Sequence, residues 1–557
     1  MHSDWALRKL QFRTLYRVFL LRIVDLELLS ADGDLTRLLG QFASIFATFS
    51  FCVTAPLVLT RGTLEMTQAW MFEHFFIETA MTVAGLIAVL NWDAAFPDKR
   101  DALVLAPLPV KRSTLLLAKM AALFAAPALA IISLNIFSGA VWPLLFRAPN
   151  SGFVDGLRSL PAYWITIFAA GAFFVFTVLT IQGLAANLLP RQLFLRVSAV
   201  LQAGCLCLLL SVYFLEPSLE SSAALTSPQN QRLLDWLPSY WFFALFNQLN
   251  GSMHPFLVPL AKRAWAGLAV SAFGACAALL LCYFRMMQQM VEQPDILPGA
   301  RSISWSPRFG GSLPTAITLF SLRTLMRSRQ HRMILSFYLG LGITIVIGYA
   351  KTTMGGFGST GTTISSSLLM ASILMMILTV LGLRVVASIP ISLPANWMIR
   401  MTQIRSAPEY RKAVRFSWLV LGVLPALLII AWFLLAASPW RPALGHLSVL
   451  LCLGVLLVEL CLYTFPKIPF TCSYLPGKGR IHFVFWVCLM FLLRLLSGAA
   501  DYEARMLDHG LSSIVMILIV AFAAVGVRWL NVSHTAPTRD LLFEEEYPTE
   551  ITALKLN

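Results

Sequence analysis

Residues 416–436 read FSWLVLGVLPALLIIAWFLLA, an apolar run that contains no charged side chain. A helix that crosses a membrane needs about 20 such residues, because the hydrocarbon core of a bilayer is about 30 Å thick. We therefore predict that this run spans a membrane, and the same rule can be applied to the rest of the chain.

Eleven further segments satisfy the rule, so the sequence predicts twelve spans. Of the 557 residues, 58% are hydrophobic and 12% charged, whereas an ordinary soluble domain has about 25% charged residues. Mean hydropathy is +0.75. These features predict an all-α, polytopic membrane helical bundle. The predicted spans are 39–60, 72–90, 115–146, 161–188, 195–215, 264–284, 332–350, 365–388, 416–436, 443–464, 482–500 and 511–530.

The apolar run at 416–436 also contains a string that occurs earlier in the chain. Pro425-Ala426-Leu427-Leu428-Ile429-Ile430 resembles Pro127-Ala128-Leu129-Ala130-Ile131-Ile132, and the offset is 425 − 127 = 298 residues. Arg323-Thr324-Leu325-Met326-Arg327 likewise resembles Arg13-Thr14-Leu15-Tyr16-Arg17, at an offset of 323 − 13 = 310 residues. The shared order and similar offset predict two six-helix repeats. Duplicated membrane units place a pathway or binding site where the two halves meet.

This organisation divides the chain into five predicted parts. The linker between the repeats contains Pro298-Gly299 and Gly310-Gly311, which interrupt any helix. The parts are an N-terminal amphipathic interfacial segment at 1–38, the first repeat at 39–285, a cytoplasmic linker at 286–314, the second repeat at 315–530 and a cytoplasmic tail at 531–557.

Three segments outside the spans have a helical pattern of their own. Residues 5–29 and 315–331 mix apolar residues with regularly spaced Arg, which predicts amphipathic helices along the inner membrane surface, with simple basic flanks as the alternative. The aromatic segment 236–249 predicts an interfacial or re-entrant helix, with a plain aromatic belt as the alternative.

The positions of the basic residues predict the orientation. Of the 42 Lys and Arg residues, 31 lie in predicted inner segments and ten in outer ones, with Lys119 inside a span. Because basic residues collect on the cytoplasmic side, both termini are predicted to be cytoplasmic in a cell (inner) membrane. The net charge of +15 has the same explanation and predicts no nucleic-acid partner.

The residues that usually carry chemistry form no recognisable pattern. The nine cysteines include no CxxC pair and lie almost entirely in apolar segments, so we expect neither a disulfide framework nor a zinc site. Paired carboxylates, HExxH and a Ser/His/Asp constellation are not evident from spacing. We therefore expect no catalytic residue, metal or cofactor in this chain, which is predicted not to be an enzyme.

The most informative loop follows the second span. It contains a charged turn, a short apolar stretch predicted to be helical, a Pro-x-Pro break and a basic pair, and the third span follows. Pro107 and Pro109 would end the short helix, because proline removes a backbone donor. The residues that define this loop are Pro97, Asp98, Lys99, Arg100, Asp101, Pro107, Pro109, Lys111 and Arg112.

On these residues the chain resembles the ABC-2 type permeases, the membrane subunits of one class of ABC transporters. That family has a short coupling helix in this loop, followed by Leu-Pro-Val/Ile-basic-basic and a Lys in the third span. Leu108-Pro109-Val110-Lys111-Arg112 and Lys119 match that pattern. The family also has a re-entrant element between its fifth and sixth spans, which corresponds to 236–249.

The resemblance covers residues 1–285, and the second half departs from it. There the loop reads Ile389-Pro390-Ile391-Ser392-Leu393-Pro394 and lacks the basic pair, and 501–510 is too short for a re-entrant helix. ABC-2 permeases usually have six spans and pair as two chains, so this chain would be a fused, asymmetric pair. The resemblance therefore does not imply that both halves couple equally to an ATPase.

Ionisable residues inside spans are candidates for a functional role, because burying a charge in a bilayer is costly. Glu78, Glu459 and Arg494 lie within predicted spans, and Lys119 is near enough to the inner surface to extend toward it. Glu78 and Arg494 both fall in the predicted outer half. We predict that Arg494 pairs with an acidic group or backbone carbonyls inside the bundle.

The resemblance implies a permease that exports an unidentified substrate. Separate ATPase subunits would bind ATP and dock on the inner loops at 91–114 and 387–413. The alternative is a secondary transporter of the major-facilitator kind, although the loop after the second span lacks Gly-x-x-x-Asp-Arg-x-Gly-Arg. A third possibility is a polytopic enzyme that acts on a lipid-linked substrate. The absence of an acidic pair or His cluster from the predicted outer loops argues against it.

Overall fold

The computed structural model describes most of the chain, and every element in the described part is helical. The described ranges are 2–24, 35–59, 66–92, 105, 107–145, 153–217, 219, 221–252, 254–292, 307–309, 311–355, 365–389, 407–463, 469–470, 481–507 and 510–533. Ten helices in these ranges are long and apolar enough to cross a membrane, and Phe42–Val58 is a shorter apolar helix. The protein is therefore an all-α, polytopic membrane bundle, as the composition predicts.

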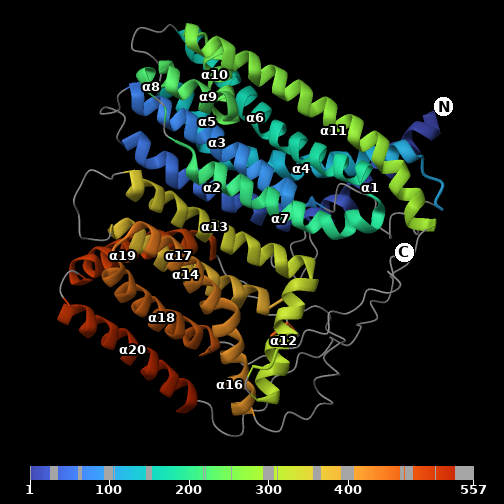
Figure 1. Ribbon diagram of the computed structural model, residues 1–557. Coiled ribbons are helices and arrows are strands. Elements are labelled where there is room, and N and C mark those ends of the chain that lie inside the picture. Colours follow the sequence, from blue (N-terminus) through green and yellow to red (C-terminus); the bar gives the residue numbers. More distant parts are fainter. Residues whose placement is uncertain are drawn as a thin grey trace. The chain divides into compact units, whose positions relative to one another are not determined.

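All twelve predicted spans coincide with helices, and most helices extend beyond the predicted ends (Figure 1). In the first half these are α2 (Leu35–Leu59), α3 (Met66–Leu90), α4 (Arg112–Leu134), α6 (Phe153–Leu188), α7 (Arg191–Leu215) and α11 (Val258–Glu292). In the second half they are α13 (Arg329–Gly355), α14 (Ser366–Ala387), α16 with η6 and α17 (Ala407–Ala437), α18 (Trp440–Tyr463), α19 (Ile481–Leu507) and α20 (Gly510–Ser533).

Two predicted boundaries are wrong. The span predicted at 115–146 is two helices, because α4 ends at Leu134 and α5 (Ile136–Leu145) begins after Asn135. The Asn135 side chain donates to the Ile131 carbonyl (3.0 Å) and accepts from the Tyr163 hydroxyl (2.8 Å), so the break is filled by polar contacts. The linker predicted from residue 286 begins later, because α11 continues to Glu292, directly before Gln293-Pro294.

The predicted surface segments are also helices. α1 (His2–Val24) covers most of 5–29, and α12 (Ser312–Arg327) covers most of 315–331. In α1, Leu15, Phe19 and Leu20 are buried, whereas Arg8, Lys9, Arg13 and Arg17 are exposed. Both segments are thus confirmed as helices, whereas their location at a membrane surface stays a prediction.

The chain divides into two compact units. Unit 1 comprises residues 1–300 and 480–486, and unit 2 comprises 301–479 and 487–557. The division after residue 300 falls within the predicted linker at 286–314.

In unit 1, α3 and α6 form the centre. α3 packs against α4, α6 and α7, while α6 packs against α11, and α1 lies along α4. The contact between α6 and α11 is close, because a Cβ on Gly183 would lie 2.5 Å from Cβ of Ala278. Small residues at such a crossing bring helix backbones together, which is a main source of association between helices in membranes.

The aromatic segment forms the short helix α10 (Pro238–Asn250), packed against α3, α6 and α11. Its residues from Ser239 to Asn247 are buried except for Trp241, which is half-buried. α10 ends at Gly251, whose φ of +87° is left-handed and favours glycine, and the Arg158 Nε donates to the Leu249 carbonyl (2.7 Å). The helix is therefore an integral part of unit 1 rather than a plain aromatic belt.

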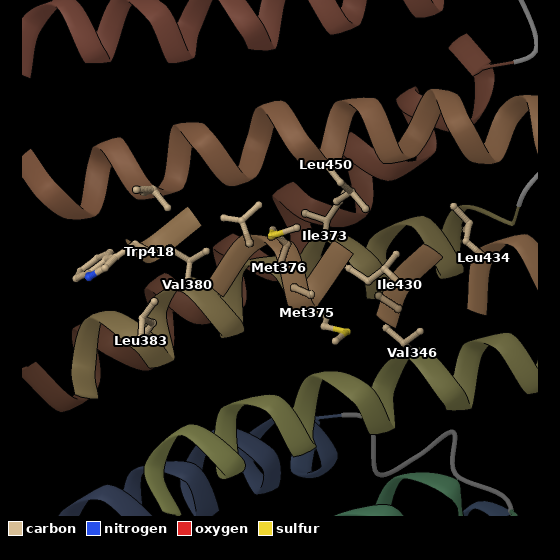
Figure 2. Close-up of a cluster of buried hydrophobic side chains, with 14 of the residues drawn as sticks. Val346, Ile373, Met375, Met376, Val380, Leu383, Trp418, Ile430, Leu434 and Leu450 are labelled. Atoms are coloured by element: carbon tan, nitrogen blue, oxygen red, sulfur yellow. The ribbon is translucent and has the colours of Figure 1, made fainter. Parts of the chain in front are cut away.

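In unit 2, α14 is the central helix and packs against α13, α17 and α18. Figure 2 shows Met375, Met376 and Val380 of α14 among buried side chains of the neighbouring helices, including Ile430 and Leu450. The remaining helices cover this core: α20 packs on α18, and α12 lies along α16.

The two units have similar packing partners. α1 lies on α4 as α12 lies on α16, α2 packs on α4 as α13 packs on α17, and α6 packs on α11 as α18 packs on α20. Pro127 lies in α4 and Pro425 in α17, each in the helix that follows the second membrane helix of its unit. One local difference is the π-helical turn η6 (Leu419–Val423), which directly precedes α17.

Candidate functional site

The loop that resembles a coupling loop begins where α3 ends. Pro97 and the charged residues Asp98, Lys99, Arg100 and Asp101 lie outside the described residues, so the predicted short helix is not described. The point of departure from α3 is described. Trp92 is fully buried, and its Nε1 donates to the Ser198 hydroxyl of α7 (2.9 Å).

Side chains of two other helices also hold the end of α3. Gln202 of α7 donates to the Val89 carbonyl (2.7 Å), and Gln182 of α6 donates to the Trp92 carbonyl. The last carbonyls of a helix have no partner within the helix, so these amides satisfy them. The end of α3 is therefore bonded to α6 and α7 directly before the loop leaves it.

The loop returns to the bundle at Pro107, Pro109 and Lys111, all exposed, and Arg112 is the first residue of α4. The Gln11 side chain of α1 donates to the Pro109 carbonyl (3.4 Å). Further along α4, Lys119 is buried, and its Nζ lies 5.5 Å from the ring centroid of Phe19 in α1. The surface helix α1 is thus attached to the far end of the loop.

The corresponding loop of unit 2 begins after α14 and is held by different groups. His331 at the start of α13 donates through Nε2 to the Ile389 carbonyl (2.9 Å), and its Nδ1 accepts from the Ser328 hydroxyl (2.6 Å). The backbone amide of Phe470 donates to the Ala387 carbonyl (2.8 Å). Here the partners come from α13 and the segment after α18, whereas in unit 1 they come from α6 and α7.

Glu459, singled out from the sequence, is the centre of a buried polar group in unit 2. Its carboxylate pairs twice with Arg415 of α16, from Nε to Oε1 (2.5 Å) and from Nη2 to Oε2 (3.0 Å). Asn531 of α20 donates to the Glu459 Oε2 (2.9 Å) and to its backbone carbonyl (2.8 Å). The group joins α16, α18 and α20. Arg415 is the last residue of the predicted inner segment 384–415, so only its contact with Glu459 reveals this role.

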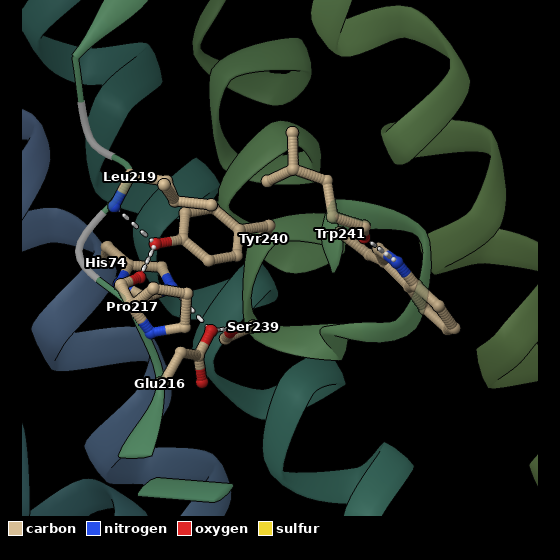
Figure 3. Close-up of polar contacts among 8 residues, drawn as sticks. His74, Glu216, Pro217, Leu219, Ser239, Tyr240 and Trp241 are labelled. Carbon is tan, nitrogen blue, oxygen red and sulfur yellow. Dashed lines mark hydrogen bonds and ion pairs between the residues drawn. The ribbon is translucent and has the colours of Figure 1, made fainter. Parts of the chain in front are cut away.

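Glu78, also singled out, belongs to a polar cluster in the first half of α3. His74, Glu78 and Glu216 each place one ligand-capable atom within 4.8 Å of those of the others. The His74 Nε2 lies 3.4 Å from the Glu216 Oε1, and the Ser239 hydroxyl donates to the same oxygen. Figure 3 shows His74, Glu216 and Ser239 together with Tyr240, whose ring stacks on His74 at a centroid distance of 4.1 Å.

Unit 2 contains a second buried histidine cluster. The His446 Nδ1 donates to the Glu503 Oε1 (2.6 Å), and Nε2 lies 2.6 Å from the Ser372 hydroxyl, which also contacts the Leu369 carbonyl (2.7 Å). The order of these groups is that of hydrolytic triads. A nucleophile must reach its substrate, however, and Ser372 and His446 are 0% exposed. We therefore interpret these three hydrogen-bonded side chains as a polar link between α14, α18 and α19.

Arg494 is exposed on α19. It does not face the interior of unit 2, so its predicted pairing inside the bundle is not supported within that unit. Across the described residues the structure thus places Lys119 and Glu459 in buried contacts and Glu78 in a cluster with His74 and Glu216. The sequence prediction missed both histidines, although the four-residue spacing of His74 and Glu78 on one helix face was a visible signal.

Comparison of the chain with protein-family models, curated proteins and solved structures found no match.

Proposed function

We propose that the chain is the transmembrane subunit of an ABC exporter of the ABC-2 type, with separate ATPase subunits that dock on its loops. The proposal includes a cytoplasmic location for both termini and for the loop at 91–114. The substrate is not identified by any described side chain. Because the chain contains no nucleotide-binding motif, ATP would be bound by the partner.

The observation that carries the proposal is the attachment of both ends of the 91–114 loop to the bundle. At one end, Trp92 and its carbonyl are bonded to α6 and α7. At the other, Pro109 is bonded to α1, and α1 packs along α4. A force applied to this loop would therefore move four membrane helices and the surface helix, rather than bend a free loop.

Such an arrangement is suited to coupling. Closure of an ATPase pair on ATP moves whatever is docked on it, and a bistable membrane bundle converts a small displacement into a change of conformation. The fully buried Trp92 prevents the end of α3 from moving independently. Helix α10, packed on α3, α6 and α11, would experience the same movement at the other end of α3.

The similar packing partners of the two units support a duplication. The two units also differ at the loops, because the end of α14 is held by His331 and Phe470 rather than by side chains of the fourth and fifth membrane helices. We therefore propose that the loop of unit 1 is the main docking site for the ATPase, and that the loop of unit 2 contributes less to its binding.

The test is affinity purification of the tagged chain from its native host, with bound proteins identified by mass spectrometry. The wild type should retain a protein with nucleotide-binding motifs of the ABC class. A variant with Asp98, Lys99, Arg100 and Asp101 all changed to Ala should lose most of it. The matched control changes Glu409, Arg411 and Lys412 of unit 2 to Ala, which should lose less.

If the chain is folded and no ATPase co-purifies, or if the loop variant retains it fully, the coupling proposal is wrong. Transport by the purified chain in liposomes under an ion gradient, without ATP, would instead favour the secondary transporter.

A further inference from the structure

We propose that His74, Glu78 and Glu216 form a binding site for a divalent metal ion, with Zn²⁺ as the ion that fits best. This inference is independent of the ABC proposal. It departs from the expectation that the chain holds no metal, which was drawn from cysteine spacing.

The backbone brings the three donors together from two elements. His74 and Glu78 are four residues apart on α3, so their side chains lie on one face, one turn apart. Glu216 directly follows α7 and caps its C-terminal end. One ligand-capable atom of each lies within 4.8 Å of the other two.

The spacing of the closest pair is that of two ligands on one ion. The His74 Nε2 and Glu216 Oε1 are 3.4 Å apart. Zinc–nitrogen and zinc–oxygen bonds are about 2.1 Å long, and two ligands of a tetrahedral ion are then about 3.4 Å apart. The atoms therefore need little movement to share one ion.

Burial and charge also favour a cation. The side chains of His74 and Glu216 are only 4% and 2% exposed. The Glu216 Oε2 is buried and accepts no hydrogen bond from the described residues. Two carboxylates and a neutral imidazole carry a charge of −2, which a divalent ion neutralises, and a buried carboxylate in a membrane protein is costly unless its charge is compensated.

Neighbouring groups hold two of the ligands in place. The Ser239 hydroxyl donates to the Glu216 Oε1, and the ring of Tyr240 stacks on His74 (Figure 3). The Tyr240 hydroxyl donates to the Pro217 carbonyl (2.7 Å) and accepts from the Leu219 amide (2.9 Å). Outer contacts of this kind orient metal ligands and raise affinity.

The donor set narrows the choice of ion. One imidazole and two carboxylates suit zinc, which accepts mixed nitrogen and oxygen ligands and often leaves a fourth position open. Magnesium and calcium prefer sites made only of oxygen. The site lies in the half of the apolar span that begins at Ala69, and His74 is about two turns along α3.

The histidine cluster of unit 2 provides a matched control. His446 uses both ring nitrogens, each at 2.6 Å from an oxygen partner, so no nitrogen is left for an ion. Glu503 near the end of α19 corresponds in chemistry to Glu216 at the end of α7, since each faces a histidine.

The experiment measures bound zinc in the full-length protein in detergent. The protein is stripped with a chelator, equilibrated with Zn²⁺, desalted, and analysed by elemental mass spectrometry. The wild type should hold about one zinc ion per chain. Glu216→Gln and His74→Ala should hold close to none, whereas the control Glu503→Gln should match the wild type.

Two further measurements keep the test decisive if His74→Ala fails to fold. Zn²⁺ should raise the melting temperature of the wild type and of Glu503→Gln but not of Glu216→Gln, because an ion that binds only the folded state stabilises it. Ser239→Ala, which removes an outer contact, should weaken zinc affinity about 10-fold or more. A folded wild type with no zinc, or equal zinc in Glu216→Gln, would overturn the proposal.

Discussion

Each unit has a cation on the helix after its second membrane helix, buried in unit 1 and partly buried in unit 2, and the two cations contact different groups. In unit 1, Lys119 of α4 lies over the ring of Phe19 in the surface helix α1. In unit 2, Arg415 of α16 pairs twice with Glu459 of α18 and leaves the surface helix α12 uninvolved in that pair. The cation of unit 1 therefore contacts α1, which is bonded to Pro109 of the 91–114 loop, whereas the cation of unit 2 contacts α18.

Two bundles with similar packing partners thus differ in the contacts that their cations make. A cation–π contact such as that of Lys119 with Phe19 is weaker than a charge-assisted hydrogen bond such as that from the Arg415 Nη2 to the Glu459 Oε2. The ends of the second membrane helices show a related contrast. Side chains of membrane helices hold the end of α3, and the residues that hold α14 come from α13 and the segment after α18.

The largest expected effect is on the ion pair of unit 2. Glu459→Ala leaves Arg415 without its carboxylate in a largely buried position, and such a loss costs about 3–5 kcal/mol. Chemical unfolding in detergent micelles would measure the free energy change. Glu409→Ala, an exposed acidic residue on the same helix as Arg415, should change it by less than about 0.5 kcal/mol.

The double variant Arg415→Met with Glu459→Leu removes both charges, so its loss should be much smaller than that of Glu459→Ala. If both variants lost the same free energy of unfolding, the cost of Glu459→Ala would not come from an uncompensated charge on Arg415.

A second comparison concerns the last helix of each unit. Gly183→Val places side-chain atoms against Ala278 at the crossing of α6 and α11, and overpacking of this kind costs about 1–3 kcal/mol. Gly526 of α20 has no atom within 4 Å of an added Cβ, so Gly526→Val should cost less than about 0.5 kcal/mol. Thermal unfolding of both variants checks this, and similar melting temperatures would contradict it.

The contact between Lys119 and Phe19 should have a smaller effect. Phe19→Leu keeps an apolar side chain and removes the aromatic face, so it should cost about 0.5–2 kcal/mol. A double-mutant cycle with Lys119→Met isolates the interaction, since the two losses should not add if the side chains interact. Additive losses would show that Lys119 is held by other contacts.

The smallest effect is expected at Arg494. Its side chain is exposed, so Arg494→Ala should change the free energy of unfolding by less than about 0.5 kcal/mol. A loss several times larger would restore the interpretation from sequence that Arg494 pairs inside the bundle.

The helices could be predicted from the sequence because the span rule depends only on local composition. The apolar run at 416–436 can be recognised without knowing what packs against it, and the same holds for the other eleven predicted spans. The break at Asn135 was missed because an apolar run of 32 residues (115–146) gives no local sign of a polar contact with Tyr163.

The buried clusters could not be assembled from the sequence because their members are far apart. Ser372 and His446 are separated by 74 residues, and His446 and Glu503 by 57. Glu459 could be singled out as a charge in a span, but its partner Arg415 lies in a stretch that the sequence assigns to the inner side. Only the packing of α16 against α18 shows the pair.

We propose that this chain is driven by a separate ATPase through the loop of unit 1. The most direct measurement is the ATP hydrolysis rate of the assembly purified through a tag on this chain and placed in lipid bilayers. The assembly should hydrolyse ATP, the chain alone should not, and changing Asp98, Lys99, Arg100 and Asp101 to Ala should abolish most of the activity that co-purifies. An assembly in which the loop variant hydrolyses ATP at the wild-type rate would contradict the claim.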